Sequence, residues 1–96
     1  MRNRYIVTYD ISDDDRRDKV FTSLRGYGDH IQYSVFRCDL SASERVSMIS
    51  RLHSLIEHNY DQILMFDLGP VDGRAASCVE AIGRKYIAPE RTVVVL

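Results

Sequence analysis

The chain has 96 residues, 45% of them hydrophobic and 28% charged, which is the composition of one folded domain and excludes a disordered chain. Its formal net charge of −1 excludes a generally basic nucleic-acid coat, so a site for a polyanion must be a local patch of a few arginines. No apolar run could span a bilayer and the N-terminus lacks a signal-peptide pattern, so we expect a cytoplasmic protein. Cys38 and Cys78 lack the CxxC spacing of a metal site, so we expect reduced thiols.

The first expected element is a strand over residues 4–11, because residues 5–9 are all β-branched or aromatic. Apolar side chains point both ways along it, so both faces of its sheet should be covered. A lone carboxylate, Asp10, stands near the end of this strand, directly before a cluster of acids and two arginines. This polar end of an apolar strand is the first candidate for a functional site.

A helix is expected over residues 13–25, with Arg16 and Arg17 in its first two turns. Ser12 and Asp15 resemble a capping box with a shorter acid, and acidic residues suit the positive end of a helix. Glycines at positions 26 and 28 end the pattern. The apolar residues at helical spacing are Val20, Phe21, Leu24 and Tyr27.

A second strand is expected over residues 30–40, in which Phe36 and Cys38 share one face. Ser41 and Glu44 have the spacing of a capping box, which predicts the start of a second helix of roughly four turns. The apolar stripe of this helix is Val46, Ile49, Leu52 and Ile56.

A third strand is expected over residues 61–68, closed by Gly69-Pro70, and Asp72-Gly73 marks a turn. Residues 78–82 fit either a short fourth strand or a helical turn, and periodicity does not decide between them. Residues 91–96, "RTVVVL", form a strongly β-prone tail.

Short connections and right-handed crossovers combine these elements into one domain over residues 1–96, of the α+β class. We expect a ferredoxin-like βαββαβ sandwich with an extra C-terminal strand and both helices on one face of the sheet. A homodimer that stacks the two sheets would cover the other face. The tail over residues 91–96 is then expected to pair with the partner subunit, which would hide an aggregation-prone edge.

Three stretches of the sequence resemble the small CRISPR-associated proteins of the Cas2 family, in the same order and with matching gaps over residues 4–86. They are "RYIVTYDISDDDRR", "GYGDHIQYSVFRCDL" and "DQILMFDLGP". The resemblance implies a homodimeric ferredoxin-like protein of antiviral immunity, which partners the CRISPR integrase in spacer acquisition and acts as a nuclease.

The resemblance also implies a site. It assigns the metal to Asp10, with the two copies facing each other across the dimer axis so that one Mg²⁺ could lie between two carboxylates. It also assigns a catalytic role to Tyr9, together with Asp10. The residues that it assigns to the site and to nucleic acid are Arg16, Arg17, Ser34, Phe36 and Arg37.

Simpler roles remain open for several of these residues. Asp10 could cap the following helix or accept hydrogen bonds from turn amides, and Phe36 could be a packing residue. Ser34 has no base fixed beside it, so we do not assign it as a nucleophile.

Two functions therefore follow: a Mg²⁺-dependent endonuclease that cuts RNA or DNA, or a non-catalytic dimeric scaffold that holds duplex DNA between two integrase dimers. Phosphate contacts do not distinguish RNA from DNA.

Overall fold

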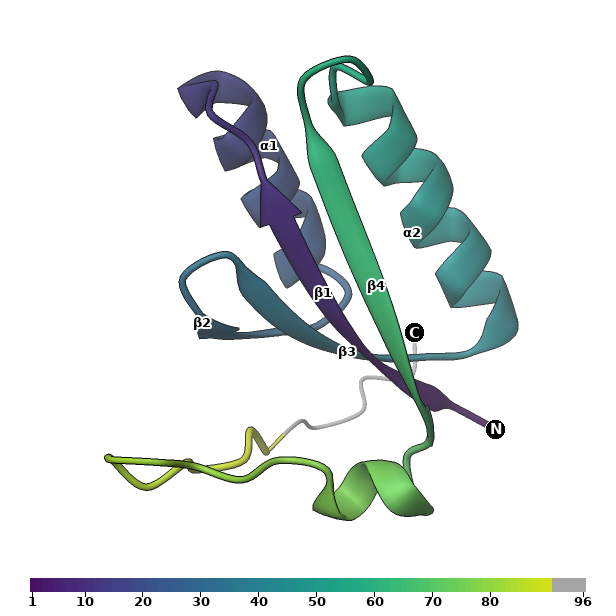
Figure 1. Ribbon diagram of the computed structural model, residues 1–96. Coiled ribbons are helices and arrows are strands. Elements are labelled where there is room, and N and C mark those ends of the chain that lie inside the picture. Colours follow the sequence, from purple (N-terminus) through teal and green to yellow (C-terminus); the bar gives the residue numbers. More distant parts are fainter. Residues whose placement is uncertain (91–96) are drawn as a thin grey trace.

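The computed structural model describes residues 1–90, and the β-prone tail over residues 91–96, with its expected pairing to a partner, lies outside the described residues. Within residues 1–90 four strands, two α-helices and one short 3-10 helix follow one another (Figure 1). They are β1 (Asn3–Asp10), α1 (Asp14–Arg25), β2 (Asp29–Gln32), β3 (Val35–Leu40), α2 (Ala42–Leu55), β4 (Gln62–Pro70) and η1 (Arg74–Ser77).

The four strands form one sheet in the order β2-β3-β1-β4, and every neighbouring pair is antiparallel. β1 therefore lies in the interior of the sheet, between β3 and β4, and β4 is an edge strand. The two helices connect strands that are not neighbours, as the βαββαβ prediction requires. The ferredoxin-like arrangement of strands and helices is confirmed.

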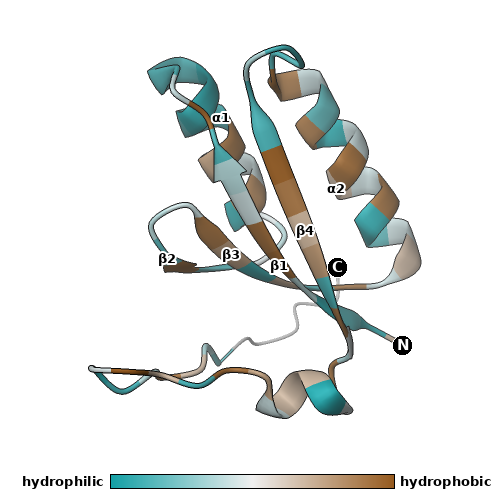
Figure 2. Ribbon diagram, viewed as in Figure 1, coloured by the Kyte–Doolittle hydropathy of each residue, from teal (hydrophilic) through white to brown (hydrophobic). Residues whose placement is uncertain are grey.

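The hydrophobic core lies between the sheet and the two helices. Along β1 the buried residues alternate, with Tyr5, Val7 and Tyr9 facing the helices, as the two-residue period of a strand requires. Apolar residues occupy the middle of β4 and part of each helix (Figure 2). The other buried members of this core are Ile11, Val20, Leu24, Phe36, Cys38, Leu40, Met48 and Leu52.

The opposite face of the sheet, which we call the open face, carries an apolar band. Cross-strand neighbours share a face, and the register pairs Ile6 with Phe66 and Thr8 with both Leu64 and Val35. Leu64 and Phe66 are 45% and 50% exposed. Over β4 the open face is thus apolar and is not covered by any part of residues 1–90, and the sheet-stacked homodimer that would cover it stays a prediction.

The chain after β4 leaves the two-layer core and runs beneath the sheet (Figure 1). η1 is held there by a hydrogen bond of 3.2 Å from Nη1 of Arg4 to the carbonyl oxygen of Ala75. Residues 78–82, for which a strand or a helical turn was expected, form neither. No helix in the described part of the chain has the length and apolar character needed to cross a membrane.

The single strand expected over residues 30–40 is in fact a hairpin, because Tyr33 and Ser34 form a turn between β2 and β3. Gly28, just before this hairpin, lies so close to β3 that a Cβ atom there would collide with the carbonyl oxygen of Arg37 and Sγ of Cys38. Only glycine fits this position without displacing β3.

Two helix details also differ from expectation. The N-cap of α1 is Asp13, not Ser12, and its side chain accepts a hydrogen bond from the backbone amide of Arg16. The capping box of α2 at Ser41 and Glu44 is confirmed, with both of its hydrogen bonds present. The expected apolar stripe is wrong at Val46, which is 65% exposed, because the buried residues of α2 are Met48 and Leu52.

Candidate functional site

Asp10 is the last residue of β1, and its side chain is exposed. It lies opposite Gln62, the first residue of β4. Because neighbouring residues of a strand point to opposite faces and Tyr9 faces the core, Asp10 projects from the open face. Within residues 1–90 its carboxylate has no hydrogen-bond or ion-pair partner. Asp10 does not cap the following helix, because the N-cap of α1 is Asp13.

Tyr9 lies on the core side of the same strand end. Its backbone amide donates to the carbonyl oxygen of Ser34 at 3.2 Å, and its ring lies 6.4 Å from that of Phe36. Burial raises the pKa of the Tyr9 phenol, an effect that a hydrogen bond with the Ser34 side chain and the charge of Arg17 partly offset. Tyr9 is therefore a neutral phenol at physiological pH, able to donate a hydrogen bond but not to act as a base.

Arg17 holds the connection between β1 and α1. Its Nη1 donates to the carbonyl oxygens of Ile11 and Ser12, at 3.2 and 3.4 Å, and its Nη2 pairs with Asp14. The hydrogen bond with Asp14 raises the pKa of Arg17. The side chain remains 38% exposed, so a phosphate group could still approach its guanidinium.

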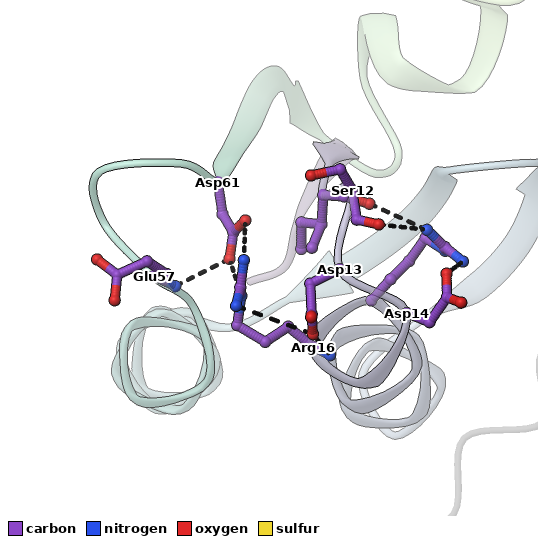
Figure 3. A network of polar contacts seen from close by, with 8 residues as sticks. Ser12, Asp13, Asp14, Arg16, Glu57 and Asp61 are labelled. Atoms are coloured by element: carbon purple, nitrogen blue, oxygen red, sulfur yellow. Dashed lines mark hydrogen bonds and ion pairs between the residues drawn. The ribbon is translucent and has the colours of Figure 1, made fainter.

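Arg16 makes a two-pronged ion pair with Asp61. Nε donates to Oδ2 at 2.7 Å and Nη2 donates to Oδ1 at 3.1 Å (Figure 3). The side chain of Asp61 is fully shielded from solvent, and that of Arg16 is 30% exposed. Hydrogen bonding to Arg16 and to the Glu57 amide lowers the pKa of Asp61, so this carboxylate is charged at neutral pH.

Three further residues assigned from the sequence lie on or beside β3. Ser34 is in the β2–β3 turn, half-buried and next to Tyr9. Phe36 is completely buried in the core, where nothing outside the chain can touch it, so it supports the site only by holding β3 in place.

Arg37 lies on the open face opposite Ile6, 3.7 Å from Asp39. Its Nη2 donates to the carbonyl oxygen of Pro89 at 3.5 Å, and within residues 1–90 its buried Nε has no partner.

The fold therefore brings five of the assigned residues to one end of the sheet, where β1 ends and α1 begins. They are Tyr9, Asp10, Arg16, Arg17 and Ser34. Arg37 lies further along the open face, level with Ile6. The sequence reasoning missed Asp61, because nothing in its local pattern distinguishes a buried partner of Arg16 from an ordinary acid at the start of a strand.

At the end of β1, residues 1–90 of one copy supply a single carboxylate without a partner for a divalent cation. In the described part of the chain no group of three or more histidine, cysteine or acidic side chains could hold a metal ion. Asp10 offers one exposed carboxylate, the oxygen donor that Mg²⁺ prefers. Two copies would supply two such carboxylates, which fits an ion that keeps most of its waters.

Comparison with known proteins agrees with this architecture. The family model of CRISPR associated protein Cas2 matches residues 2–73. The chain is 40% identical over 92 residues to a protein of Rhodospirillum rubrum named CRISPR-associated endoribonuclease Cas2 1, covering 96% of this chain and 89% of that one.

Two solved structures are also similar to it. A hypothetical protein from Thermus thermophilus has a TM-score of 0.75 and 33% identity, covering 94% of this chain and 100% of its own. Cas2 from Streptococcus pyogenes, crystallised at pH 6.5, has a TM-score of 0.71 and 27% identity, covering 83% of this chain and 99% of its own. The chain belongs to the CRISPR associated protein Cas2 family.

Proposed function

We propose that two copies of this chain form a Mg²⁺-dependent endonuclease of CRISPR immunity, which cuts RNA or DNA phosphodiesters and acts with the CRISPR integrase in spacer acquisition. The observation that carries the proposal is the exposed carboxylate of Asp10, which ends a central strand and has no partner within residues 1–90. The relative from Rhodospirillum rubrum, named as an endoribonuclease, supports the same activity.

Asp10 of each copy would hold the ion, which would supply polarisation of a phosphodiester and a more acidic bound water. Arg17 would bind a neighbouring phosphate, which its 38% exposed side chain allows. Tyr9, neutral and hydrogen-bonded to the β2–β3 turn, fixes Ser34 beside the end of β1. The test is cleavage of RNA, single-stranded DNA and duplex DNA by highly purified protein, with and without Mg²⁺.

The dimer in this proposal uses the apolar band of the open face. Phe66→Glu puts a charge where a second sheet would pack, which should raise the dimer dissociation constant at least about 100-fold. Phe66 is 50% exposed, so the chain itself should fold. Sedimentation equilibrium measures the change, with Tyr60→Glu, at an exposed loop residue, as the control. Equal dissociation constants for wild type and Phe66→Glu would show that the sheets do not stack on this band.

Arg17→Ala should weaken binding to all nucleic-acid sequences evenly. A phosphate contact carries no sequence information, and losing it should reduce the slope of log K against log salt by about one unit. Fluorescence anisotropy over a salt series measures both quantities. A loss of binding confined to certain sequences would mean that Arg17 reads bases instead.

A non-catalytic scaffold is the second candidate, because residues 1–90 of each copy offer one carboxylate without a partner at the end of β1 and no cluster of three metal-binding side chains. Nucleases of the two-metal type gather several carboxylates around their ions. In the scaffold function the dimer would hold duplex DNA between integrase dimers through its arginines. Spacer capture that is normal with Asp10→Asn, together with no cleavage by the wild type, would favour the scaffold.

A further inference from the structure

The ion pair between Arg16 and Asp61 joins two parts of the chain that are 45 residues apart in sequence. Arg16 is in the first turn of α1, and Asp61 directly precedes β4. The pair has the geometry of two parallel hydrogen bonds, of 2.7 and 3.1 Å. Such fork-shaped pairs fix orientation as well as distance.

Asp61 is held from a second side as well. The backbone amide of Glu57 donates to Oδ2 of Asp61 at 2.8 Å, and the amide of Asp61 donates to the carbonyl oxygen of Glu57 at 2.9 Å. The loop between α2 and β4 is thus closed on the same carboxylate that Arg16 binds (Figure 3). The side chain of Asp61 is fully shielded from solvent, and the positive charge of Arg16 compensates its negative charge.

This arrangement lies directly beside the candidate site. Gln62, the next residue after Asp61, is the cross-strand partner of Asp10. On the other side, Arg17 binds the carbonyl oxygens of Ile11 and Ser12, the two residues that follow Asp10. Arg17 therefore holds the end of β1 through the residues that follow it. Arg16 holds it through Asp61 and the start of β4.

We propose that Arg16 is a positioning residue, which acts through Asp61 and the start of β4 to hold Asp10 in place, and that it does not contact phosphate. The inference rests on the proposed function of Asp10. Its physical basis is that the guanidinium of Arg16 is already engaged, because Nε and Nη2 both donate hydrogen bonds to Asp61. A phosphate that displaced Asp61 would leave a shielded carboxylate without its counter-charge, which is strongly unfavourable.

The test compares Arg16→Ala with Asp61→Asn, because the two roles predict different patterns. If Arg16 positions Asp10, both variants lower the cleavage rate at saturating nucleic acid by about 10- to 100-fold, the range for supporting partners of a metal ligand. Both keep the wild-type affinity and salt slope for nucleic acid. If Arg16 binds phosphate, Arg16→Ala alone weakens binding and reduces the salt slope by about one, which overturns the proposal.

Arg16→Lys adds a second discrimination. Lysine retains the charge for a phosphate contact but cannot make the two parallel hydrogen bonds to Asp61. The positioning role predicts that it loses cleavage nearly as much as Arg16→Ala does. Wild-type cleavage with Arg16→Lys, combined with weak nucleic-acid binding by Arg16→Ala, contradicts the proposal.

Amide hydrogen exchange gives a readout that is independent of nuclease activity. In both Arg16→Ala and Asp61→Asn we expect exchange at residues 9–12 and 62–64 to accelerate at least about tenfold, because local opening no longer breaks the ion pair. The double variant should add little to either single one. Arg2→Ala, which removes an ion pair with Glu44 near the other end of β1, is the control and should leave these amides unchanged.

Unchanged exchange near Asp10 in both variants overturns the positioning role, even if the wild type is an active nuclease. Conversely, a wild type that does not cut nucleic acid overturns the proposed function, and exchange then still reports whether Arg16 and Asp61 hold the end of β1. The two failures are therefore distinguishable.

Discussion

Replacing Asp10 by Asn is expected to abolish Mg²⁺-dependent cleavage while the protein stays folded and dimeric. Asn keeps the shape of the side chain but removes one charge from each copy, and it replaces one carboxylate oxygen by an NH2 group that cannot bind Mg²⁺. Mutating a residue that supports a metal ligand typically lowers activity about 10- to 100-fold. Loss of the ligand itself should therefore lower the cleavage rate at least about 100-fold. Cleavage of labelled RNA and DNA by purified protein measures the effect.

Asp15→Asn is the matched control for this change, because Asp15 is an exposed acid in the first turn of α1. It removes the same charge a few residues away and should leave cleavage unchanged. Thermal unfolding and sedimentation confirm that both variants keep fold and dimer. Cutting that survives in Asp10→Asn would remove Asp10 from the mechanism and point to another site or a contaminating enzyme.

Phe36→Ala is expected to lower the free energy of unfolding by about 3–5 kcal/mol, the range for deleting a buried aromatic ring. Phe36 is completely buried and lies between Phe21, Tyr9 and His30, whose ring centroids are 5.4, 6.4 and 5.0 Å away. Urea unfolding at one fixed protein concentration measures the loss, since dimerisation makes apparent stability depend on concentration.

Tyr33→Ala is the control for Phe36→Ala, because Tyr33 lies in the neighbouring turn and is 93% exposed. It should change the free energy of unfolding by no more than about 0.5 kcal/mol. A small loss of stability in Phe36→Ala, accompanied by a large loss of nucleic-acid binding, would show that the ring is available to ligands after all.

The elements that local chemistry determines could be predicted from the sequence. The apolar run before Asp10 predicted β1, and Ser41 with Glu44 predicted the capping box of α2. The turn between β2 and β3 could not be found in this way, because Tyr33 and Ser34 are not a glycine, proline or asparagine turn pair. The stripe over α2 was misplaced at Val46, since the direction in which a helix faces its sheet depends on tertiary packing.

The candidate site was predictable to the same extent. The sequence placed Asp10 at the end of a strand and two arginines at the start of a helix, and the structure places them there. It contained no local signal that Arg16 pairs with Asp61, because a contact over 45 residues leaves no spacing pattern. Nor could it tell which of the neighbours Tyr9 and Asp10 is buried, because the side of β1 that the helices cover depends on tertiary packing.

Metal binding by the intact dimer tests the central claim most directly. Titration with Mn²⁺, followed by electron paramagnetic resonance, counts the ions bound and can be read without any nucleic acid present. If Asp10 of two copies shares one ion, wild-type protein binds one Mn²⁺ per dimer at this site and Asp10→Asn binds none. One ion per chain, or the same binding in Asp10→Asn as in the wild type, would contradict a metal site shared between two Asp10 carboxylates.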